Sequence, residues 1–468
     1  MVDVNTRIIV SIGPASSSEE VLSKMVALGV SGFRVNFAHG SKEIWSRYAS
    51  LVRSVESSSG RYVSLIGDIV GPSLRLGQLE RPLGIAKGTV VRFSIQSKQP
   101  PEASALSPVV PVDVPPRVFQ ELSAGDTVIM DDGRVSFTIV EVGDKYFDAL
   151  AQTDSTLSSR KAFTVRGKEF DLPLLSKNDL EDVAFACRSS FDYLGLSYIR
   201  SAEDVQQVRN LLEKLDCNAG LLAKIETISA LKNLDSIIEA SDGVVVARGD
   251  LGMNIGLEEL PSVQKRVVRR CKELGKPAIV ATQLLESMRE NPVPTRAEVV
   301  DVYEAVVSGV DALMLTGETA VGKYPVEVVR WLSRIAKTAE SVAPPTTERF
   351  VADLRTRFVK GVVELAEDIG ATIAIYSMHG RTARRASAMR PKVPVYVGVP
   401  RAEEARKLSI LWGLNVFVIE ALNYIEGLEK LYKHLTSSGL LKVGDVVVLA
   451  YGFTEEHEEV IRIRKVSV

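Results

Sequence analysis

Cysteine and histidine are scarce in this chain, and the few present form no obvious binding pattern. The 468 residues include four histidines and three scattered cysteines, Cys187, Cys217 and Cys271, with no CxxC spacing. This pattern argues against a disulfide framework, a zinc site or a histidine-rich metal centre. It fits the reducing cytosol, so we expect a cytoplasmic location.

Long apolar runs and an excess of either charge are also absent. No uninterrupted apolar stretch is long enough to span a bilayer, and the N-terminus has no signal-peptide pattern. The 57 lysines and arginines nearly balance the 59 aspartates and glutamates, which leaves a formal net charge of −2. We therefore expect neither nucleic acid nor membrane as a partner, whereas a small anionic ligand would need only a few local cations.

Short apolar runs, in contrast, recur eight times along the chain. They are Ile8–Ile12, Gly32–Asn36, Tyr62–Asp68, Tyr193–Ser197, Leu221–Ile225, Val244–Arg248, Ala278–Thr282 and Ala312–Thr316. Such runs suit strands buried on both faces of a parallel sheet, and amphipathic segments such as Glu19–Ala27 and Arg296–Ser308 suit the helices between them. Eight such units predict an α/β fold of the closed (β/α)8 (TIM barrel) type.

Two further sections interrupt or follow this rhythm. Between Gly71 and about Gly167, turn residues and short β-like runs replace the helical periodicity, which predicts a small β-barrel domain inserted after the third strand. A proline-bearing stretch at 342–347 marks the exit from the barrel, and the pattern beyond it predicts an open α/β domain. We assign 1–70 and 169–343 to the barrel, 71–168 to the inserted lid and 344–468 to the C-terminal domain.

Polar and charged residues stand at the ends of the predicted barrel strands. They include Arg34, Asn36, His39, Asp68, Arg75, Lys224, Glu226, Asp250 and Thr282. Because all eight strands end at the same mouth, these side chains should share one rim, and charge at a buried strand end is costly unless it pairs or meets a ligand. Each residue alone also has a plain structural explanation: Lys224 and Glu226 could be an ion pair, and Thr282 a helix cap.

The mixture of residue types indicates a reaction class. Glu226 and Asp250 supply the hard oxygen ligands that Mg²⁺ or Mn²⁺ prefers. Arg34, Lys224 and Arg75 supply fixed positive charge of the kind that stabilises a transferring phosphoryl group.

The backbone near these residues suggests a further anion contact. We expect Gly249–Gly252 to form a flexible turn whose amides approach a carboxylate. The sequence has no glycine-rich P-loop with its Lys-Ser/Thr pair, which excludes a P-loop nucleotidase.

Seven segments, in this order, resemble the pyruvate kinase family. They are Thr6–Ala15, Arg34–Gly40, Leu222–Glu226, Val246–Gly252, Ala281–Met288, Pro294–Glu298 and Met314–Ala320. The match spans the whole chain, and the three predicted sections resemble the family's A, B and C domains. The resemblance implies a phosphotransferase of glycolysis that passes the phosphoryl group of phosphoenolpyruvate to ADP, giving pyruvate and ATP.

The resemblance also implies roles for the rim residues. Glu226 and Asp250 would hold the divalent metal, while Lys224 and Arg34 would bind the transferring phosphoryl group, with Lys224 as the main transition-state stabiliser. Thr282 and the Gly249–Asp250 backbone would position the carboxylate of phosphoenolpyruvate, and Thr282 with ordered water is a candidate proton donor to the enolate.

The nucleotide contacts carry over in the same way. Asn36, His39 and Arg75 would meet ADP. In the lid, Lys161 matches the lysine that reaches ADP on closure, although the neighbouring Arg160 could take that place.

The chain departs from the family at the monovalent cation site. Asn36 and Asp68 match two of its usual ligands, but Ala38 replaces a serine, and Ile69 and Ser73 also differ from the pattern associated with potassium dependence. We therefore predict an enzyme that needs Mg²⁺ or Mn²⁺ but little K⁺.

In the C-terminal domain, relatives bind phosphorylated effectors in a loop after the first strand. The matching residues are Ser377, His379, Gly380, Arg381 and Thr382, which could form a phosphate nest or an ordinary turn with a capping threonine. The resemblance further implies a homotetramer.

Two other functions remain open on the sequence alone. A magnesium-dependent barrel lyase or aldolase acting on a pyruvate enolate would explain Glu226 and Asp250 but not the insertion or Arg75. An inactive regulatory homologue would not explain why the charged positions outside the potassium site are intact.

Overall fold

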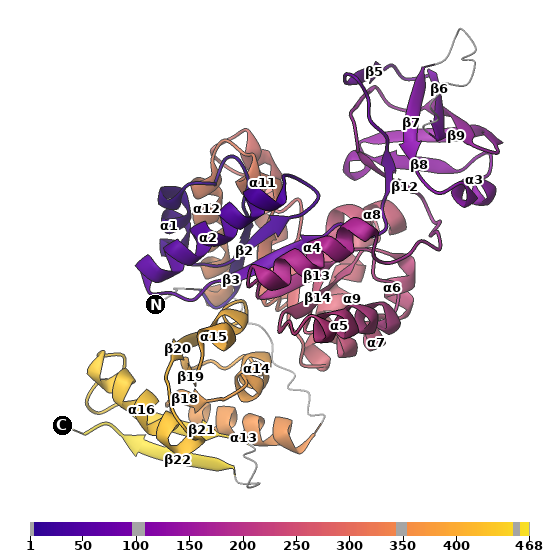
Figure 1. The fold of residues 1–468 in the computed structure, drawn as a ribbon. Coiled ribbons are helices and arrows are strands. Elements are labelled where there is room, and N and C mark those ends of the chain that lie inside the picture. Colours follow the sequence, from indigo (N-terminus) through magenta and orange to yellow (C-terminus); the bar gives the residue numbers. More distant parts are fainter. Residues whose placement is uncertain (1–3, 96–107, 343–352, 453–458, 468) are drawn as a thin grey trace.

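Eight parallel strands close into a barrel at the centre of the molecule (Figure 1). The computed structural model describes residues 4–95, 108–342, 353–452 and 459–467. The barrel strands are β1 (Arg7–Ser11), β2 (Val30–Asn36), β3 (Ser64–Ile69), β13 (Tyr193–Leu196), β14 (Gly220–Ile225), β15 (Gly243–Ala247), β16 (Ala278–Ala281) and β17 (Ala312–Leu315). All eight predicted strands are confirmed, because each apolar run is buried on both faces as expected.

Helices surround the barrel and cover its outer face. They include α1 (Glu19–Ala27), α2 (Lys42–Ser59), α4 (Lys177–Arg188), α5 (Ala202–Lys214), α6 (Ile228–Lys232), α7 (Leu234–Ala240), α9 (Leu260–Glu273), α10 (Arg296–Val307) and α12 (Pro325–Val342). Capping fixes several starts: Ser176 and Thr295 each form a capping box with the residue three positions on. None of the helices in the described part of the chain combines the length and apolarity that a bilayer span requires.

The predicted insertion between β3 and α4 is a second, smaller barrel that stands off the mouth of the first (Figure 1). Its strands are β4 (Leu74–Leu76), β6 (Val90–Ile95), β7 (Val109–Asp113), β8 (Thr127–Met130), β9 (Val135–Gly143), β10 (Tyr146–Ala151) and β12 (Ala162–Val165). Beside them lie the pair β5 (Leu83–Ile85) and β11 (Ser155–Leu157) and the short helix α3 (Arg117–Glu121). Alternating apolar residues meet inside, where Phe93, Phe137 and Phe147 pack together.

The C-terminal domain is the open α/β sheet that the sequence predicts. Its order is β20 (Leu414–Val418), β19 (Val395–Val399), β18 (Thr372–Tyr376), β21 (Val446–Tyr451) and β22 (Val460–Lys465), with β22 antiparallel at the edge. The helices are α13 (Leu354–Asp368), α14 (Arg381–Ala388), α15 (Ala402–Leu408) and α16 (Tyr424–Ser437). The proposed exit from the barrel, at 342–347, lies almost entirely outside the described residues.

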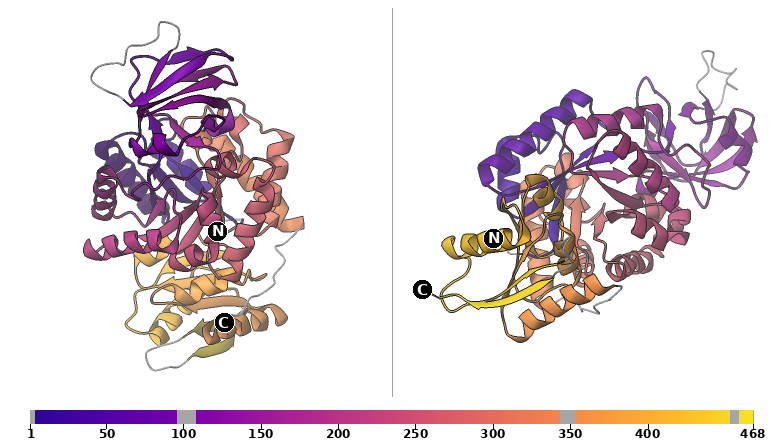
Figure 2. Two further views of the ribbon diagram at one scale, coloured as in Figure 1. Left: turned by 90° about the vertical axis from the view of Figure 1, so that its right-hand side faces the viewer. Right: turned by 60° about the horizontal axis from the view of Figure 1, so that its bottom comes forward.

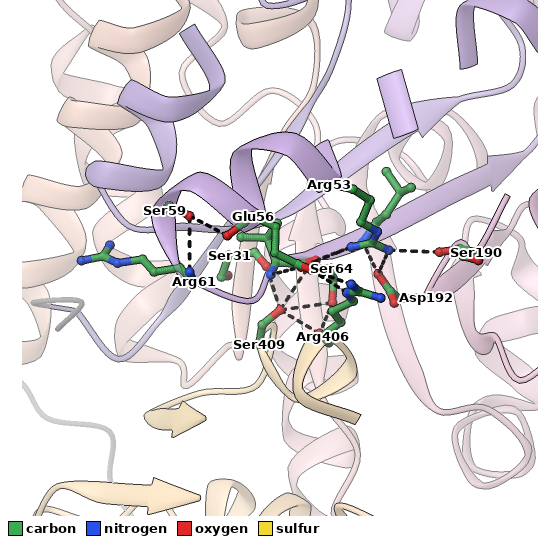
Figure 3. Close-up of polar contacts among 12 residues, drawn as sticks. Ser31, Arg53, Glu56, Ser59, Arg61, Ser64, Ser190, Asp192, Arg406 and Ser409 are labelled. Carbon is green, nitrogen blue, oxygen red and sulfur yellow. Dashed lines mark hydrogen bonds and ion pairs between the residues drawn. The ribbon is translucent and has the colours of Figure 1, made fainter. Parts of the chain in front are cut away.

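The lid and the C-terminal domain lie at opposite ends of the barrel (Figure 2). At the lower end, Ile410 enters the barrel core beside Ile9, Ile66 and Tyr193 and is fully buried. Around it, a polar network fastens α15 to the barrel, as Figure 3 shows. The β-barrel base is thus filled by the C-terminal domain, and the strand ends that carry the charged residues face the lid.

Arg406 and Ser409 bond directly to the barrel at this junction. The guanidinium of Arg406 donates to Glu56 Oε1 at 2.8 and 2.6 Å, and Glu56 is almost fully buried. The hydroxyl of Ser409 donates to the carbonyl of Ser31 at 2.8 Å and accepts from the amide of Ser64 at 3.1 Å. Because Ser64 begins β3 and Asp68 lies near its other end, the junction fixes one of the strands that reaches the site.

The expectation that the cysteines form no disulfide was wrong. A disulfide joins Cys187, at the end of α4, to Cys217, in the turn after α5, across a sequence separation of 30 residues. Cys271 is free and buried. The bond links two neighbouring helical units on the outside of the barrel, so the cysteine pattern no longer supports a reducing compartment.

Candidate active site

The predicted strand-end residues meet at the upper mouth of the barrel. A cavity of about 90 Å³ there is lined by residues from seven strands or their following turns, among them Arg34, Asp68, Lys224, Asp250 and Thr282. Glu226, two residues beyond Lys224 on the same side of the chain, lies behind them and is fully buried. A single site therefore gathers residues that are more than 200 positions apart in sequence.

Lys224 lies at the centre of this group. Its ammonium nitrogen is 2.8 Å from Glu226 Oε1, 2.8 Å from the hydroxyl of Ser197 and 3.5 Å from Asp68 Oδ2. Burial alone would lower the pKa of Lys224, but the carboxylates of Asp68 and Glu226 outweigh that effect and raise it. The side chain therefore keeps its positive charge in a site largely closed to solvent.

Asp68 connects Lys224 to the second cation, Arg34. The guanidinium of Arg34 donates to Asp68 Oδ2, at 2.9 Å from Nε, and to the hydroxyl of Ser11 at 3.0 Å. Burial raises the pKa of Asp68, but Arg34 and Lys224 together overcome this and lower it. Gly195 makes the arrangement possible, because a Cβ at that position would lie 2.7 Å from Asp68 Oδ1.

The two predicted metal carboxylates are linked through Tyr198. The amide of Tyr198 donates to Glu226 Oε2 at 2.8 Å, and its hydroxyl donates to Asp250 Oδ1 at 3.2 Å. Glu226 Oε1 forms an ion pair with the Lys224 ammonium at 2.8 Å, but the two groups are not aligned as a hydrogen bond. Burial raises the pKa of Glu226; Lys224 opposes this and Asp250 adds to it. A buried carboxylate oxygen beside a second carboxylate fits a divalent cation with hard oxygen ligands.

No larger group of metal ligands exists in the described ranges. In them, three or more His, Cys, Asp or Glu side chains nowhere cluster closely enough to hold a metal. Mg²⁺ held by one or two carboxylates generally keeps further coordination positions for substrate oxygens and water.

The segment expected to form a flexible turn, Gly249–Gly252, is helical instead. It belongs to α8 (Arg248–Ile255), which starts directly after β15, so the Gly249 amide is one of the unpaired donors of a first helical turn. That amide donates to Thr282 Oγ1 at 2.8 Å. The structure thus brings Gly249, Asp250 and Thr282 together, as predicted. Gly249 and Asp250, however, lie in the first turn of a helix and not in a loop.

Thr282 and Gln283 have unusual backbone angles. Their φ values are 72° and 51°, in the left-handed region that a β-branched residue such as threonine rarely adopts. Arg248 holds this turn: its guanidinium donates to the carbonyls of Thr282 at 2.8 Å and Gln283 at 2.7 Å, and it pairs with Asp301 at 2.7 Å. Conformations of this kind persist where surrounding contacts enforce them, often at functional sites.

Arg248 was singled out in the sequence only as a strand-end charge, and Tyr198 not at all. Arg248 is almost fully buried, and its partners lie 34 and more positions away along the chain. Its place in the fourth of the seven matching segments, directly before Gly249, was the one available signal. No sequence signal pointed to Tyr198.

The residues assigned to the nucleotide lie around the entrance below the lid. Burial and the positive charges of Arg75 and Arg34 lower the pKa of His39. Arg75 donates to the hydroxyl of Ser73 at 2.9 Å and to the carbonyl of Arg160 at 3.1 Å. Asn36 Oδ1 accepts from the Ala38 amide at 3.1 Å, which uses this oxygen within its own turn.

On the lid side, Lys161 pairs with Asp131 at 3.3 Å. Asp131 begins the short 3₁₀ helix η1 (Asp131–Gly133), which lies next to α8. One ion pair, Arg134 to Glu286 at 4.0 Å, crosses from the lid to the barrel. The lid thus reaches the side of the site that carries Asp250.

The predicted effector residues also share a cavity, about 60 Å³ in volume, in the C-terminal domain. Ser377, His379, Arg381 and Thr382 line it together with Arg355 and Arg385. Gly380 caps the start of α14 with a φ of 70°, a conformation that favours glycine. Three arginines and two hydroxyls therefore converge beside a helix N-terminus.

Comparison with known proteins gives a consistent result over the whole chain. Residues 4–329 match the pyruvate kinase barrel-domain family, and residues 357–464 match the pyruvate kinase alpha/beta-domain family. The curated pyruvate kinase of Pyrobaculum aerophilum is 40% identical over 431 residues, 91% of either chain, and that of Aeropyrum pernix is 37% identical, with 98% and 99% covered.

Solved structures agree with these matches. The crystal structure of pyruvate kinase from Pyrobaculum aerophilum has a TM-score of 0.86 at 37% identity and 98% coverage of both chains. A pyruvate kinase from Cryptosporidium parvum has a TM-score of 0.87 at 28% identity, with 99% of this chain and 96% of that chain covered. With its fold, its strand-end residues and these matches in agreement, the chain belongs to the pyruvate kinase family.

Proposed function

We propose that the chain transfers the phosphoryl group of phosphoenolpyruvate to ADP, giving pyruvate and ATP. The observation that carries this proposal is the buried Lys224, which keeps its charge between Asp68 and Glu226 and lines the same cavity as Arg34 and Asp250. A transferring phosphoryl group needs fixed positive charge and exclusion of water more than it needs covalent chemistry. This site supplies both.

Each rim residue then has a defined role. Glu226 and Asp250 hold Mg²⁺ or Mn²⁺, which when bound neutralises charge on the substrate oxygens. Lys224 and Arg34 bind the phosphoryl oxygens, and their carboxylate partner Asp68 fixes both side chains in place before substrate arrives. Because these groups are preorganised, little reorganisation is needed as charge moves in the transition state.

The carboxylate of phosphoenolpyruvate is assigned to Thr282 and the start of α8. Thr282 Oγ1 accepts from the Gly249 amide, so its hydroxyl hydrogen points away from that amide and is free to donate to substrate. Asn36, His39 and Arg75, with Lys161 from the lid, are assigned to ADP. Closure of the lid would exclude water and limit hydrolysis.

We also propose that K⁺ contributes little. Asp68 already faces two cations, Arg34 and Lys224, and Asn36 Oδ1 is engaged by the Ala38 amide. One oxygen of each of these two side chains thus already contacts a protein partner. This supports the prediction drawn from Ala38, Ile69 and Ser73.

A coupled assay tests the function and the cation requirement together. The purified chain should form pyruvate from phosphoenolpyruvate only when ADP and Mg²⁺ or Mn²⁺ are present, and added K⁺ at constant ionic strength should change the rate little. Pyruvate release that does not need ADP would contradict the transfer reaction and indicate hydrolysis of phosphoenolpyruvate. Strong stimulation by K⁺ but not by tetramethylammonium would contradict the cation assignment.

The C-terminal cavity is proposed as a site for a phosphorylated effector, which Arg381 would bind with Ser377, His379, Gly380 and Thr382. By isothermal titration with a sugar phosphate and a nucleoside monophosphate, Arg381→Ala should weaken binding of the active compound by roughly 10-fold or more, the loss expected for one charged hydrogen bond. Arg357→Ala, on the exposed side of α13, is the matched control. Equal binding by both variants would exclude this loop.

Assembly into a homotetramer is also part of the proposal. The edge strand β22 exposes Ile461 and Ile463, at 41% and 54%, next to unpaired backbone groups of a sheet edge. An exposed apolar edge strand is a common pairing surface.

A further inference from the structure

Tyr198 has a strained backbone directly beside the two carboxylates. Its φ of 56° lies in the left-handed region, which an aromatic residue adopts only when its surroundings enforce it. Tyr198 follows β13, and the two carboxylates that it contacts, Glu226 and Asp250, follow the next two strands, β14 and β15.

Main chain and side chain of Tyr198 contact different carboxylates. The amide reaches Glu226 Oε2 at 2.8 Å, and the hydroxyl reaches Asp250 Oδ1 at 3.2 Å. The left-handed conformation is what allows one residue to point both groups toward the same site. In an extended strand the amide points within the plane of the sheet and the side chain stands perpendicular to that plane, so the two groups would point in different directions.

A second residue ties the same two positions from the other side. The side-chain amide of Asn254 donates to the carbonyl of Glu226 at 2.7 Å and to the carbonyl of Asp250 at 3.2 Å. Asn254 thus fixes the two backbones relative to each other, whereas Tyr198 fixes the carboxylate groups. Together they leave each carboxylate little freedom to rotate.

Tyr198 also lines a cavity beside the two segments that connect the barrel to the lid. This cavity of about 60 Å³ is also lined by Ser73, from the segment that leaves the barrel, and by Phe163 and Phe170, from the segment that returns. One side of Tyr198 therefore faces this cavity, while its amide and its hydroxyl contact the two carboxylates. A hydrogen-bond donor whose own backbone conformation is fixed supports a carboxylate that could otherwise rotate.

We infer that Tyr198 is a positioning residue that presents the carboxylates of Glu226 and Asp250 together to a divalent cation. The inference rests on the proposed function only in taking these two carboxylates as the metal ligands. The hydroxyl fixes the orientation of the Asp250 carboxylate before the cation binds, so the cation does not have to order it. Groups that orient metal ligands in this way typically contribute a tenfold to hundredfold gain in metal affinity.

Titration with Mn²⁺, followed by electron paramagnetic resonance of the free ion, tests this without substrate or turnover. Tyr198→Phe keeps the ring and removes only the hydroxyl, so its Kd for Mn²⁺ should rise by roughly 10-fold, the lower end of the range for groups that support metal ligands. The matched control is Tyr376→Phe, which removes a buried hydroxyl that donates to the carbonyl of Ile419 at 3.0 Å in the C-terminal domain. Its Kd should equal that of the wild type.

Other outcomes would overturn the inference in different ways. A wild-type Kd in Tyr198→Phe, or equal weakening in both variants, would show that the hydroxyl has no specific part in metal binding. Absence of Mn²⁺ binding by the wild-type protein would instead contradict the assignment of Glu226 and Asp250 as ligands, and with it this inference. Melting curves of both variants confirm that they are folded during the titration.

Discussion

Replacing Lys224 by methionine is expected to lower kcat for phosphoryl transfer by roughly 10³- to 10⁵-fold, the range for removal of a fixed cation from a transferring phosphoryl group. Methionine has a similar length and no charge. The loss should be large because the ammonium contacts Asp68, Glu226 and Ser197 in a mostly buried position, where a fixed charge acts more strongly than in bulk water. The effect should appear in kcat more than in KM, since the charge matters most in the transition state.

Steady-state assays of Lys224→Met, of a control variant and of the wild type at saturating Mg²⁺ measure this effect. Lys265→Met is the matched control, because this lysine is 64% exposed and only approaches Glu304 at 3.8 Å. It should behave as wild type. Thermal unfolding in the presence of Mg²⁺ is needed alongside, because Lys224→Met leaves the buried Glu226 carboxylate without its lysine partner, which is destabilising. A folded Lys224→Met enzyme with a rate near that of wild type would contradict the mechanism.

Loss of the Cys187–Cys217 disulfide should lower the free energy of unfolding by about 3–4 kcal/mol, from the loop-closure entropy of the 30-residue separation. The bond closes a loop that contains β13 and α5, and β13 leads directly into Ser197 and Tyr198. Denaturant unfolding of the wild type with and without a reductant measures the effect.

The double variant Cys187→Ser, Cys217→Ser provides the control for this experiment. It should unfold at the lower midpoint of the reduced wild type and should not respond to reductant, since Cys271 is buried and unpaired. If the wild type unfolds at the same midpoint in both conditions and the variant matches it, the disulfide does not contribute to stability in solution.

The fold could be predicted from the sequence because each strand is recognised by its own short run of apolar residues. Each barrel strand is a short run buried on both faces, so hydrophobicity alone marks it, and the predicted runs coincide with β1, β2, β3 and β13–β17 to within a few residues. The site followed from the fold: once the strands are parallel and closed, residues at their carboxyl ends share one mouth. This is why Lys224, Asp68 and Thr282 could be placed together before their contacts were known.

The features that were missed depend on contacts between distant segments. Tyr198 matters through its left-handed backbone and two hydrogen bonds to other strands, and neither leaves a mark on composition or periodicity. Gly249–Gly252 has two glycines and so looked like a turn, but the segment is held as a helix whose first amide bonds to Thr282. Cys187 and Cys217 have no motif spacing, because helix packing brings them together.

The central claim is that this chain passes a phosphoryl group directly from phosphoenolpyruvate to ADP at the strand-end site. Phosphorus NMR of the purified protein with both substrates and Mg²⁺ follows the transferred atom itself, with no coupling enzyme. We expect the phosphoenolpyruvate signal to be replaced by the signals of ATP, while inorganic phosphate stays at background. Without Mg²⁺, the phosphoenolpyruvate signal should remain and no ATP should form. Inorganic phosphate appearing in place of ATP, or an unchanged spectrum with Mg²⁺ present, would contradict it.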